Sequence, residues 1–272
     1  MPLRWIVRPL EWQLQTTMTS PTMGMCARCG CHVDTCGGLR CLQISEGKLR
    51  AIVELCGPVQ LVLVLGSPPC EDLALVNADR TGVMGKKSGL LHYVFIVLDL
   101  LNIVQPTVKV HFLVENIQFM ADHDKRYIDK RFGAHDALAA HSIAFNSKCL
   151  TPVSRPRLYW TNLPGAREHM AMLEYAPQTS AMLTLADILD SGRTTYATHS
   201  DCLLRSGQKG RPVVGNDGEA DLLRPAEAER VMTVEGYTSK CKLSTKERLE
   251  LLGASWHLRT IVELLQPLAK RV

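Results

Sequence analysis

The pattern of apolar and polar positions becomes regular near residue 45. From Ser45 to Leu55, apolar residues recur at helical spacing behind a serine that can cap, and Gly57 and Pro58 end the pattern. The run from Val59 to Leu65 is β-branched and apolar, which predicts a buried strand. This strand stops at Gly-Ser-Pro-Pro, a turn-forming sequence that places the next residue in a loop.

A second helix and strand follow. Residues 90–104 are apolar nearly all round, which predicts a buried helix. Val108–Val114 predicts the next strand, which leads into Glu115. A strand–helix–strand unit has parallel strands, so Cys70 and Glu115 should lie at neighbouring carboxyl ends, where open α/β sheets bind ligands. We therefore expect an α/β fold with a mostly parallel sheet.

Composition narrows the class of protein. The chain has 272 residues, 46% of them hydrophobic, which suits an ordinary α/β protein of about one domain. A formal net charge of +4 permits a polyanionic partner without requiring one. No stretch has the composition of a signal peptide or a membrane span, so we expect no membrane association. The ten cysteines then favour a reducing compartment over a disulfide framework.

Five of the cysteines are crowded before residue 42. Cys26 and Cys29 have the C-x₂-C spacing of zinc sites, and Cys31, His32, Cys36 or Cys41 could complete a tetrahedral set. Zinc knuckles, however, normally separate two ligand pairs by a longer spacer. A zinc site and a metal-free segment both remain open.

Cys70 is a candidate nucleophile. Pro68 and Pro69 have fixed φ angles and no N–H group, so the loop that presents the sulfur is stiff. The alternative is a structural cysteine, because free cysteines are among the most buried residue types.

Several motifs in order resemble those of one family. Residues 66–70 (Gly-Ser-Pro-Pro-Cys), 115–117 (Glu-Asn-Ile) and 155–160 (Arg-Pro-Arg-Leu-Tyr-Trp) resemble the fourth, sixth and eighth conserved motifs of DNA cytosine-5 methyltransferases. Residues 162–165 (Asn-Leu-Pro-Gly) and 252–256 (Leu-Gly-Ala-Ser-Trp) are similar to the animal-type de novo subfamily. Three motifs in order are much more specific than any one of them.

The resemblance implies methyl transfer from S-adenosylmethionine to C5 of a cytosine flipped out of double-stranded DNA, in the nucleus. It implies that Cys70 attacks C6 and that Glu115 donates a proton to N3. Arg155 and Arg157 would bind the cytosine O2 and a phosphate. From the residues alone, Glu115 could instead be a carboxylate in a salt bridge, and the two arginines could be solvated surface.

The resemblance also implies binding residues. Ser255 and Trp256 match the last cofactor motif, and the expected DNA contacts are Asn77, Thr198, His199, Ser200, Lys209 and Arg211. His199 stands where the subfamily is expected to have an arginine that reads guanine. Histidine cannot make the bidentate guanine contact, so His199 either relaxes target choice or makes no base contact.

The family's glycine-rich cofactor loop is not recognisable before residue 45. We therefore expect a Rossmann-like methyltransferase sheet that is incomplete on its N-terminal side, with a small DNA-recognition insertion. The expected segments are 1–44 (divergent, cysteine-rich), 45–165 (catalytic core), 166–225 (target recognition) and 226–272 (the rest of the core). The alternative function is a truncated product without cofactor binding, or an inactive regulatory partner of a homologous methyltransferase subunit.

Overall fold

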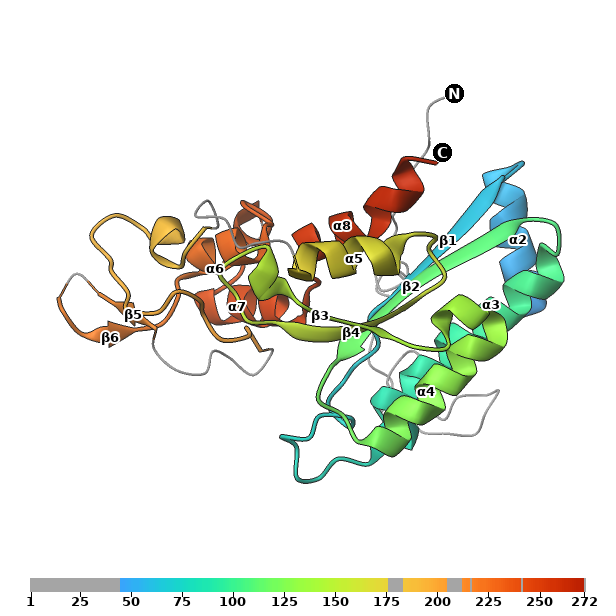
Figure 1. The fold of residues 1–272 in the computed structure, drawn as a ribbon, viewed down its shortest axis with the longest axis horizontal. Helices are drawn as coiled ribbons and strands as arrows, with labels where there is room; N and C mark the ends of the chain where they lie inside the picture. Colours follow the sequence, from blue (N-terminus) through green and yellow to red (C-terminus); the bar gives the residue numbers. More distant parts are fainter. Residues whose placement is uncertain (1–44, 176–182, 205–211, 216, 241, 272) are drawn as a thin grey trace, which may run out of the picture. The chain divides into compact units, whose positions relative to one another are not determined.

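A computed structural model describes residues 45–175, 183–204, 212–215, 217–240 and 242–271 (Figure 1). The chain divides after Gly57 into two compact units, each described here by itself. In the first unit, helix α2 spans Glu46–Cys56. The Ser45 hydroxyl accepts a hydrogen bond from the amide of Lys48, and Gly57 ends the helix at a φ of 70°. The predicted helix and its capping serine are confirmed.

The second unit contains a four-stranded sheet in the order β1-β2-β4-β3. Its strands are β1 (Leu61–Gly66), β2 (Lys109–Ile117), β3 (Ile143–Asn146) and β4 (Pro156–Thr161). Strands β1 and β2 are parallel, as predicted, but β2–β4 and β3–β4 are antiparallel. The expectation of a mostly parallel sheet was therefore wrong for this part of the chain. Residues 147–155, which join β3 to β4, are too few for the helical crossover that parallel neighbours need.

Helices cover both faces of the sheet. The helices of this unit are α3 (Leu91–Val104), α4 (Asp122–His135), α5 (Ala166–Tyr175), α6 (Pro225–Met232), α7 (Thr245–Ala254) and α8 (Leu258–Ala269), of which α3, α4, α5 and α8 cover the sheet. Single 3₁₀ turns lie at Gly82–Met84, Ser88–Leu90, Ala137–Ala139, Ser147–Cys149, Ala186–Ile188 and Thr238–Lys240, and a two-stranded sheet pairs β5 (Val213–Val214) with β6 (Ala220–Asp221). Figure 1 shows α3 and α4 on one face of the four-stranded sheet and α5 and α8 on the other. None of the helices in the described part of the chain has the length and apolarity that a bilayer span requires.

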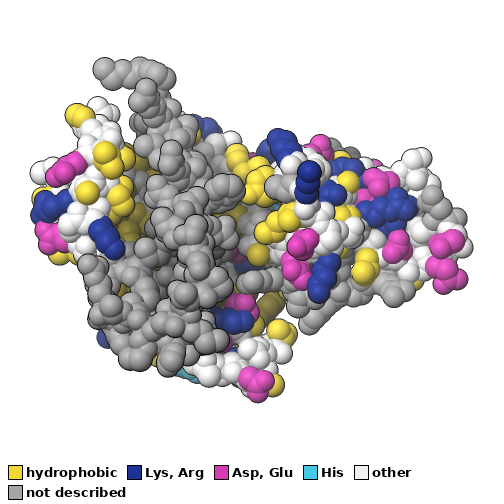
Figure 2. All heavy atoms as spheres, turned by 180° about the vertical axis from the view of Figure 1, so that it is seen from behind, with side chains coloured by type: hydrophobic (Ala, Val, Ile, Leu, Met, Phe, Trp, Pro, Cys, Tyr) yellow, Lys and Arg dark blue, Asp and Glu magenta, His cyan; other side chains and the backbone are white. Residues whose placement is uncertain are grey.

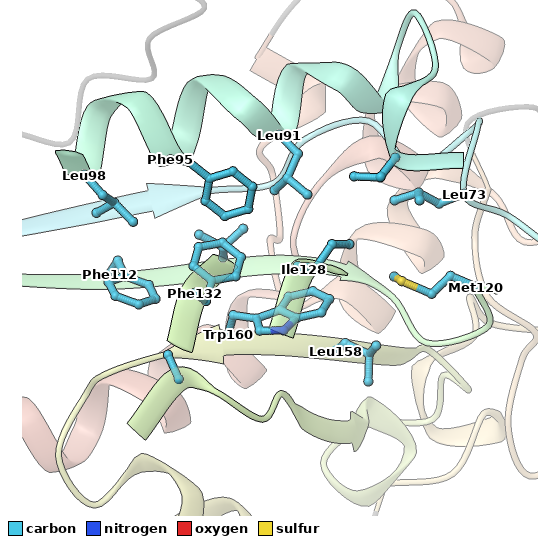
Figure 3. Packing of buried hydrophobic residues seen from close by; sticks show 13 residues of the cluster. Leu73, Leu91, Phe95, Leu98, Phe112, Met120, Ile128, Phe132, Leu158 and Trp160 are labelled. Atoms are coloured by element: carbon cyan, nitrogen blue, oxygen red, sulfur yellow. The ribbon is translucent and has the colours of Figure 1, made fainter. Parts of the chain in front are cut away.

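Alternation along the inner strands divides the core. Phe112 of β2 and Trp160 of β4 face α3 and α4, where they meet Phe95 and Phe132 (Figure 3). The Phe132 ring lies 4.8 Å from the Phe95 ring, 5.3 Å from that of Phe112 and 5.8 Å from that of Trp160, measured between centroids. Such aromatic contacts supply a large share of the buried area of a core.

The intervening positions face the other way. Leu113 of β2 and Tyr159 of β4 pack with Met170 of α5 and Leu264 of α8. A third cluster joins α6 and α7 to the segment before β4 through Val153, and it includes Val213 of the small sheet. The odd-numbered face of β2 and β4 that holds Leu113 and Tyr159 is also the face on which Glu115 and Arg157 stand.

Two burial predictions were only half right. Helix α3 is buried along the face that touches the sheet, but Ile96 and Ile103 on its other side are 40% and 55% exposed. Every residue of β1 is half-buried rather than buried. Within the described residues β1 is an edge strand, so its apolar side chains are packed from fewer directions than those of β2.

The aromatic core should dominate the stability of the second unit. Phe95→Ala removes a fully buried ring between α3 and the sheet, and we expect a loss of about 3–5 kcal/mol in the free energy of unfolding. Ile103→Ala on the exposed side of the same helix should cost less than about 1 kcal/mol. Urea unfolding of both variants checks this, and equal losses would contradict the assigned packing.

Candidate active site

The loop that carries Cys70 is fixed from two sides. The Asn116 side chain at the end of β2 donates a hydrogen bond to the Pro68 carbonyl, at 3.2 Å. The Ser88 hydroxyl donates to the Pro69 carbonyl, at 3.3 Å. The two prolines have no N–H groups, so these carbonyls are the polar groups by which the loop can be anchored. The half-buried Cys70 sulfur is thereby presented at the carboxyl end of β1, as the sequence predicted.

Glu115 is the centre of a buried charge cluster. Its side chain is about 5% exposed, and Oε1 lies 2.7 Å from Nε of Arg157 and 4.0 Å from Nη2 of Arg155. Its other oxygen, Oε2, accepts a 2.7 Å hydrogen bond from the Ser67 hydroxyl. Tyr159 is the cross-strand partner of Glu115, so Arg157 is its diagonal neighbour on the same face of the sheet.

Arg155 is engaged mainly by main-chain carbonyls. Its Nη2 donates to the carbonyl of Ser255 at 2.7 Å, and its Nη1 donates to the carbonyl of Leu203 at 3.3 Å. Nη1 also donates to the sulfur of Cys202 at 3.5 Å. Arg155 therefore joins three segments that are far apart in the sequence.

Burial sets the charge state of the site. It raises the pKa of the Cys70 thiol, and nearby Glu71 and Glu115 act in the same direction, while Arg157 opposes them. Burial alone would lower the pKa of Arg157, but Cys202 and Glu115 beside it raise that pKa above its ordinary value. Two buried guanidinium groups thus face one glutamate, which suits a ligand that brings electron-rich oxygen.

The described DNA-binding candidates have varied surroundings. The Asn77 amide donates to the Glu71 carbonyl at 2.8 Å, so it organises the loop after Cys70. His199 is exposed, and its ring nitrogen Nδ1 lies 2.9 Å from the Thr198 hydroxyl. Ser200 is only 3% exposed, and its amide and hydroxyl both donate to the Pro152 carbonyl. Lys209 and Arg211 lie outside the described residues.

The two cofactor candidates, Ser255 and Trp256, follow α7. The Ser255 hydroxyl donates to the Leu252 carbonyl at 2.9 Å. The indole nitrogen of Trp256 is a buried donor with no hydrogen-bond partner among the described residues. The zinc candidates Cys26, Cys29, Cys31 and Cys36 fall outside those residues, and the part of the chain that is described contains no cluster of ligating side chains that could hold a metal ion.

Two site residues were missed by sequence reasoning. Ser67 was treated only as part of the turn before Cys70, although it hydrogen-bonds Glu115. Cys202 was not singled out, yet its sulfur accepts from both Arg155 and Arg157. Nothing in the spacing of Cys202 from other motifs predicts this contact, because it depends on how the chain returns to β4.

Together these features define a class. Cys70 follows β1, Glu115 lies near the end of the parallel neighbour β2, the antiparallel strand β4 and the residue before it bring two arginines beside Glu115, and helices cover both faces of the sheet. The chain has a mixed α/β, Rossmann-like methyltransferase fold. A similar solved structure is that of the Dnmt2 methyltransferase from S. pombe, with a TM-score of 0.52 and 14% identity over 83% of this chain and 82% of that chain. No family model matches the sequence.

The reactivity of Cys70 should depend on Arg157. Alkylating agents attack the thiolate, so the alkylation rate of Cys70 should rise with pH through a midpoint above the ordinary thiol pKa. Arg157→Gln removes a charge that lowers this pKa, and the midpoint should therefore move further up. Iodoacetamide labelling followed by peptide mass spectrometry measures it.

Cys149 is the matched control, because burial raises its pKa as well but Arg157 is not among the causes. Its midpoint should stay unchanged in Arg157→Gln. An unchanged or lower midpoint for Cys70 would contradict the assigned electrostatics.

Proposed function

We propose that the chain is a DNA (cytosine-5) methyltransferase that transfers a methyl group from S-adenosylmethionine to a flipped cytosine. The observation that carries this proposal is that Glu115 pairs with Arg157 and that both residues act electrostatically on the Cys70 thiol. The sulfur, a carboxyl group and a guanidinium are the groups that activation of a cytosine ring requires. The fold is consistent with the reaction but does not choose the substrate.

The proposed chemistry begins at C6. The Cys70 sulfur, once deprotonated, adds to C6, and the electrons of the C5–C6 double bond move through the ring toward N3. Glu115 donates a proton to N3 as that charge develops, so C5 becomes an enamine-like carbon that can accept the methyl group. A base then removes the C5 proton, the C5–C6 double bond re-forms and expels the sulfur as a thiolate, and N3 returns its proton to Glu115.

Glu115 must change its hydrogen bonding for this step. In the structure, Oε1 is ion-paired with Arg157, and Oε2 accepts a hydrogen bond from Ser67. Donation to N3 requires that one oxygen first takes up a proton. The Ser67 hydroxyl can both donate and accept, so it can turn to accept from the protonated carboxyl group without loss of the contact.

The described residues fit only one side of the cofactor. Trp256 offers an apolar ring with an unpartnered buried N–H group, which suits a ligand with a polar edge. Ser255 is next to it, with its carbonyl held by Arg155. S-adenosylmethionine would supply the methyl group as an electrophile, and no glycine-rich loop accompanies these two residues in the described part of the chain.

DNA binding is proposed from the site rather than from surface charge. Figure 2 shows basic and acidic side chains interspersed on the visible face, with no continuous basic area among the coloured residues. The candidate active site, by contrast, holds two buried arginines beside one glutamate. A base and its phosphate would be attracted to that excess of positive charge.

The second candidate function is a non-catalytic partner of a homologous methyltransferase. It is favoured by the internal hydrogen bonds of Arg155, because the Leu203 and Ser255 carbonyls occupy its donors and join the recognition segment to the Ser255 segment. A scaffold of this kind needs no cofactor. Cofactor binding therefore separates the two functions.

Replacement of the nucleophile tests the proposed enzyme. Cys70→Ser should lower methyl transfer to background and leave the Kd for duplex DNA within about twofold, since it removes one sulfur from a half-buried position. Duplex DNA that contains 5-fluorocytosine should form a covalent adduct with the wild type only, because fluorine at C5 blocks the final elimination.

Calorimetric titration with S-adenosylhomocysteine is the companion measurement. Binding to wild type and to Cys70→Ser would support the enzyme. Absence of heat at high ligand concentration would favour the regulatory partner, and an adduct that persists in Cys70→Ser would identify another nucleophile.

His199 should decide the base that follows the target. A neutral imidazole cannot present the paired donors with which arginine reads guanine, a contact that supplies about 1–3 kcal/mol of discrimination. We expect weak preference for CpG over CpA in the wild type and a preference of about tenfold in His199→Arg. Competition binding with the two duplexes measures it. A strong CpG preference without the substitution would show that a different residue reads the guanine.

A further inference from the structure

The sulfur of Cys202 is held at the centre of a polar cluster. It accepts hydrogen bonds from Nη1 of Arg155 and Nη2 of Arg157, both at 3.5 Å. Its own thiol donates to the Leu203 carbonyl at 3.4 Å. Cys202 belongs to the segment between Gly165 and Arg224 that is proposed to recognise DNA, whereas both arginines belong to the segment that leads into and forms β4.

The contacts continue to the nucleophile loop. Arg157 contacts Cys202 through Nη2 and Glu115 through Nε, the latter at 2.7 Å. The opposite oxygen of Glu115 accepts from Ser67, also at 2.7 Å, and Ser67 lies three positions before Cys70. We call Cys202, Arg157, Glu115 and Ser67 the polar path.

Cys202 supplies the third anchor of the Arg157 guanidinium. The planar group pairs with Glu115 through Nε, donates to the Pro156 carbonyl through Nη1 at 2.9 Å, and donates to Cys202 through Nη2. Without Cys202, Nη2 would lose its hydrogen-bond partner among the described residues, and the buried group would tilt to find another. A tilt would also move Glu115, and a displacement of about 1 Å can cost roughly a hundredfold in rate.

Other roles for this thiol find no support. Cys202 is a free cysteine, and within the described residues it belongs to no metal-binding cluster. Two of its three polar contacts are to the arginines of the site, and the third is to the Leu203 carbonyl.

We propose that Cys202 is a positioning residue that couples the seating of the recognition segment to the orientation of Arg157 and Glu115. The proposal rests on the proposed function for its catalytic consequence. When the recognition segment is seated on DNA, the sulfur holds Arg157 in the geometry that serves the base. When the segment is displaced, the guanidinium loses one anchor, and the pocket is no longer set for reaction.

The coupling can be measured without any ligand. Cys202→Val removes both the donor and the acceptor role of the thiol at similar side-chain volume. Ser67→Ala removes the hydroxyl at the other end of the polar path. In a double-mutant cycle by urea unfolding, independent effects on the unfolding equilibrium constant multiply. We expect a departure from the product of about threefold or more. The same cycle with Cys149→Val, a half-buried cysteine packed among apolar residues, should give the product within about twofold.

Methyl transfer supplies the second readout. Cys202→Val should lower kcat by about tenfold or more and leave the Kd for duplex DNA within about twofold, because the sulfur orients Arg157 and does not touch DNA. Cys202→Ser keeps a donor and two acceptor positions and should recover most of kcat. Cys149→Val should match the wild type.

The outcomes separate the two proposals. A multiplicative cycle, or a Cys202→Val enzyme with normal kcat, would overturn the positioning role. A serine variant as slow as the valine variant would do the same, since a purely steric role would then explain both. A wild type without methyl transfer but with a coupled cycle would overturn the proposed function and support the positioning contact.

Discussion

The buried pair of Glu115 and Arg157 is the interaction on which the rest of the site depends. An unpaired charge in this position would be expelled, because loss of one partner of a buried pair typically costs about 3–5 kcal/mol. The pair crosses from β2 to β4, so it requires the antiparallel register that sets Glu115 diagonal to Arg157. Ser67 attaches the nucleophile loop to the same carboxylate. The register of β2 against β4 therefore determines the geometry of the candidate active site.

The two arginines have different surroundings, although the sequence presents them as an equivalent pair. Arg157 pairs with the Glu115 carboxylate, and Glu115 and Cys202 together raise the pKa of Arg157, which keeps its guanidinium charged. Arg155 donates hydrogen bonds from Nη1 to the Leu203 carbonyl and from Nη2 to the Ser255 carbonyl. Arg157 also donates to the Pro156 carbonyl through Nη1, so both guanidinium groups use main-chain carbonyls, while Arg155 links the Leu203 and Ser255 segments to the start of β4. Such a network stabilises only when every member is satisfied.

Features encoded locally could be predicted from the sequence, and features set by tertiary packing could not. The cap at Ser45 and the loop after β1 depend on residues within a few positions, and both were predicted. Helix α3 looked buried all round because periodicity shows which residues are apolar, not how many neighbours will pack on them. Ser67 and Cys202 reach Glu115 and the arginines from 48 and about 45 positions away, a distance at which spacing carries no information.

Burial within the candidate active site raises the pKa of the Cys70 thiol and so lowers its reactivity. Desolvation raises its pKa more than Arg157 lowers it, so the protonated thiol is favoured in the free protein near neutral pH. A nucleophile of this kind is protected from adventitious electrophiles and oxidants, which attack the thiolate. It gains reactivity only when a bound group changes the balance of charge around it. Electron-rich oxygen placed on Arg157 would compete for the guanidinium, so activation of the sulfur must come from proton removal or from closer approach of the cation. The proposed function thus requires that substrate binding rearranges the charged groups around Glu115, because their arrangement in the free protein does not activate the Cys70 thiol.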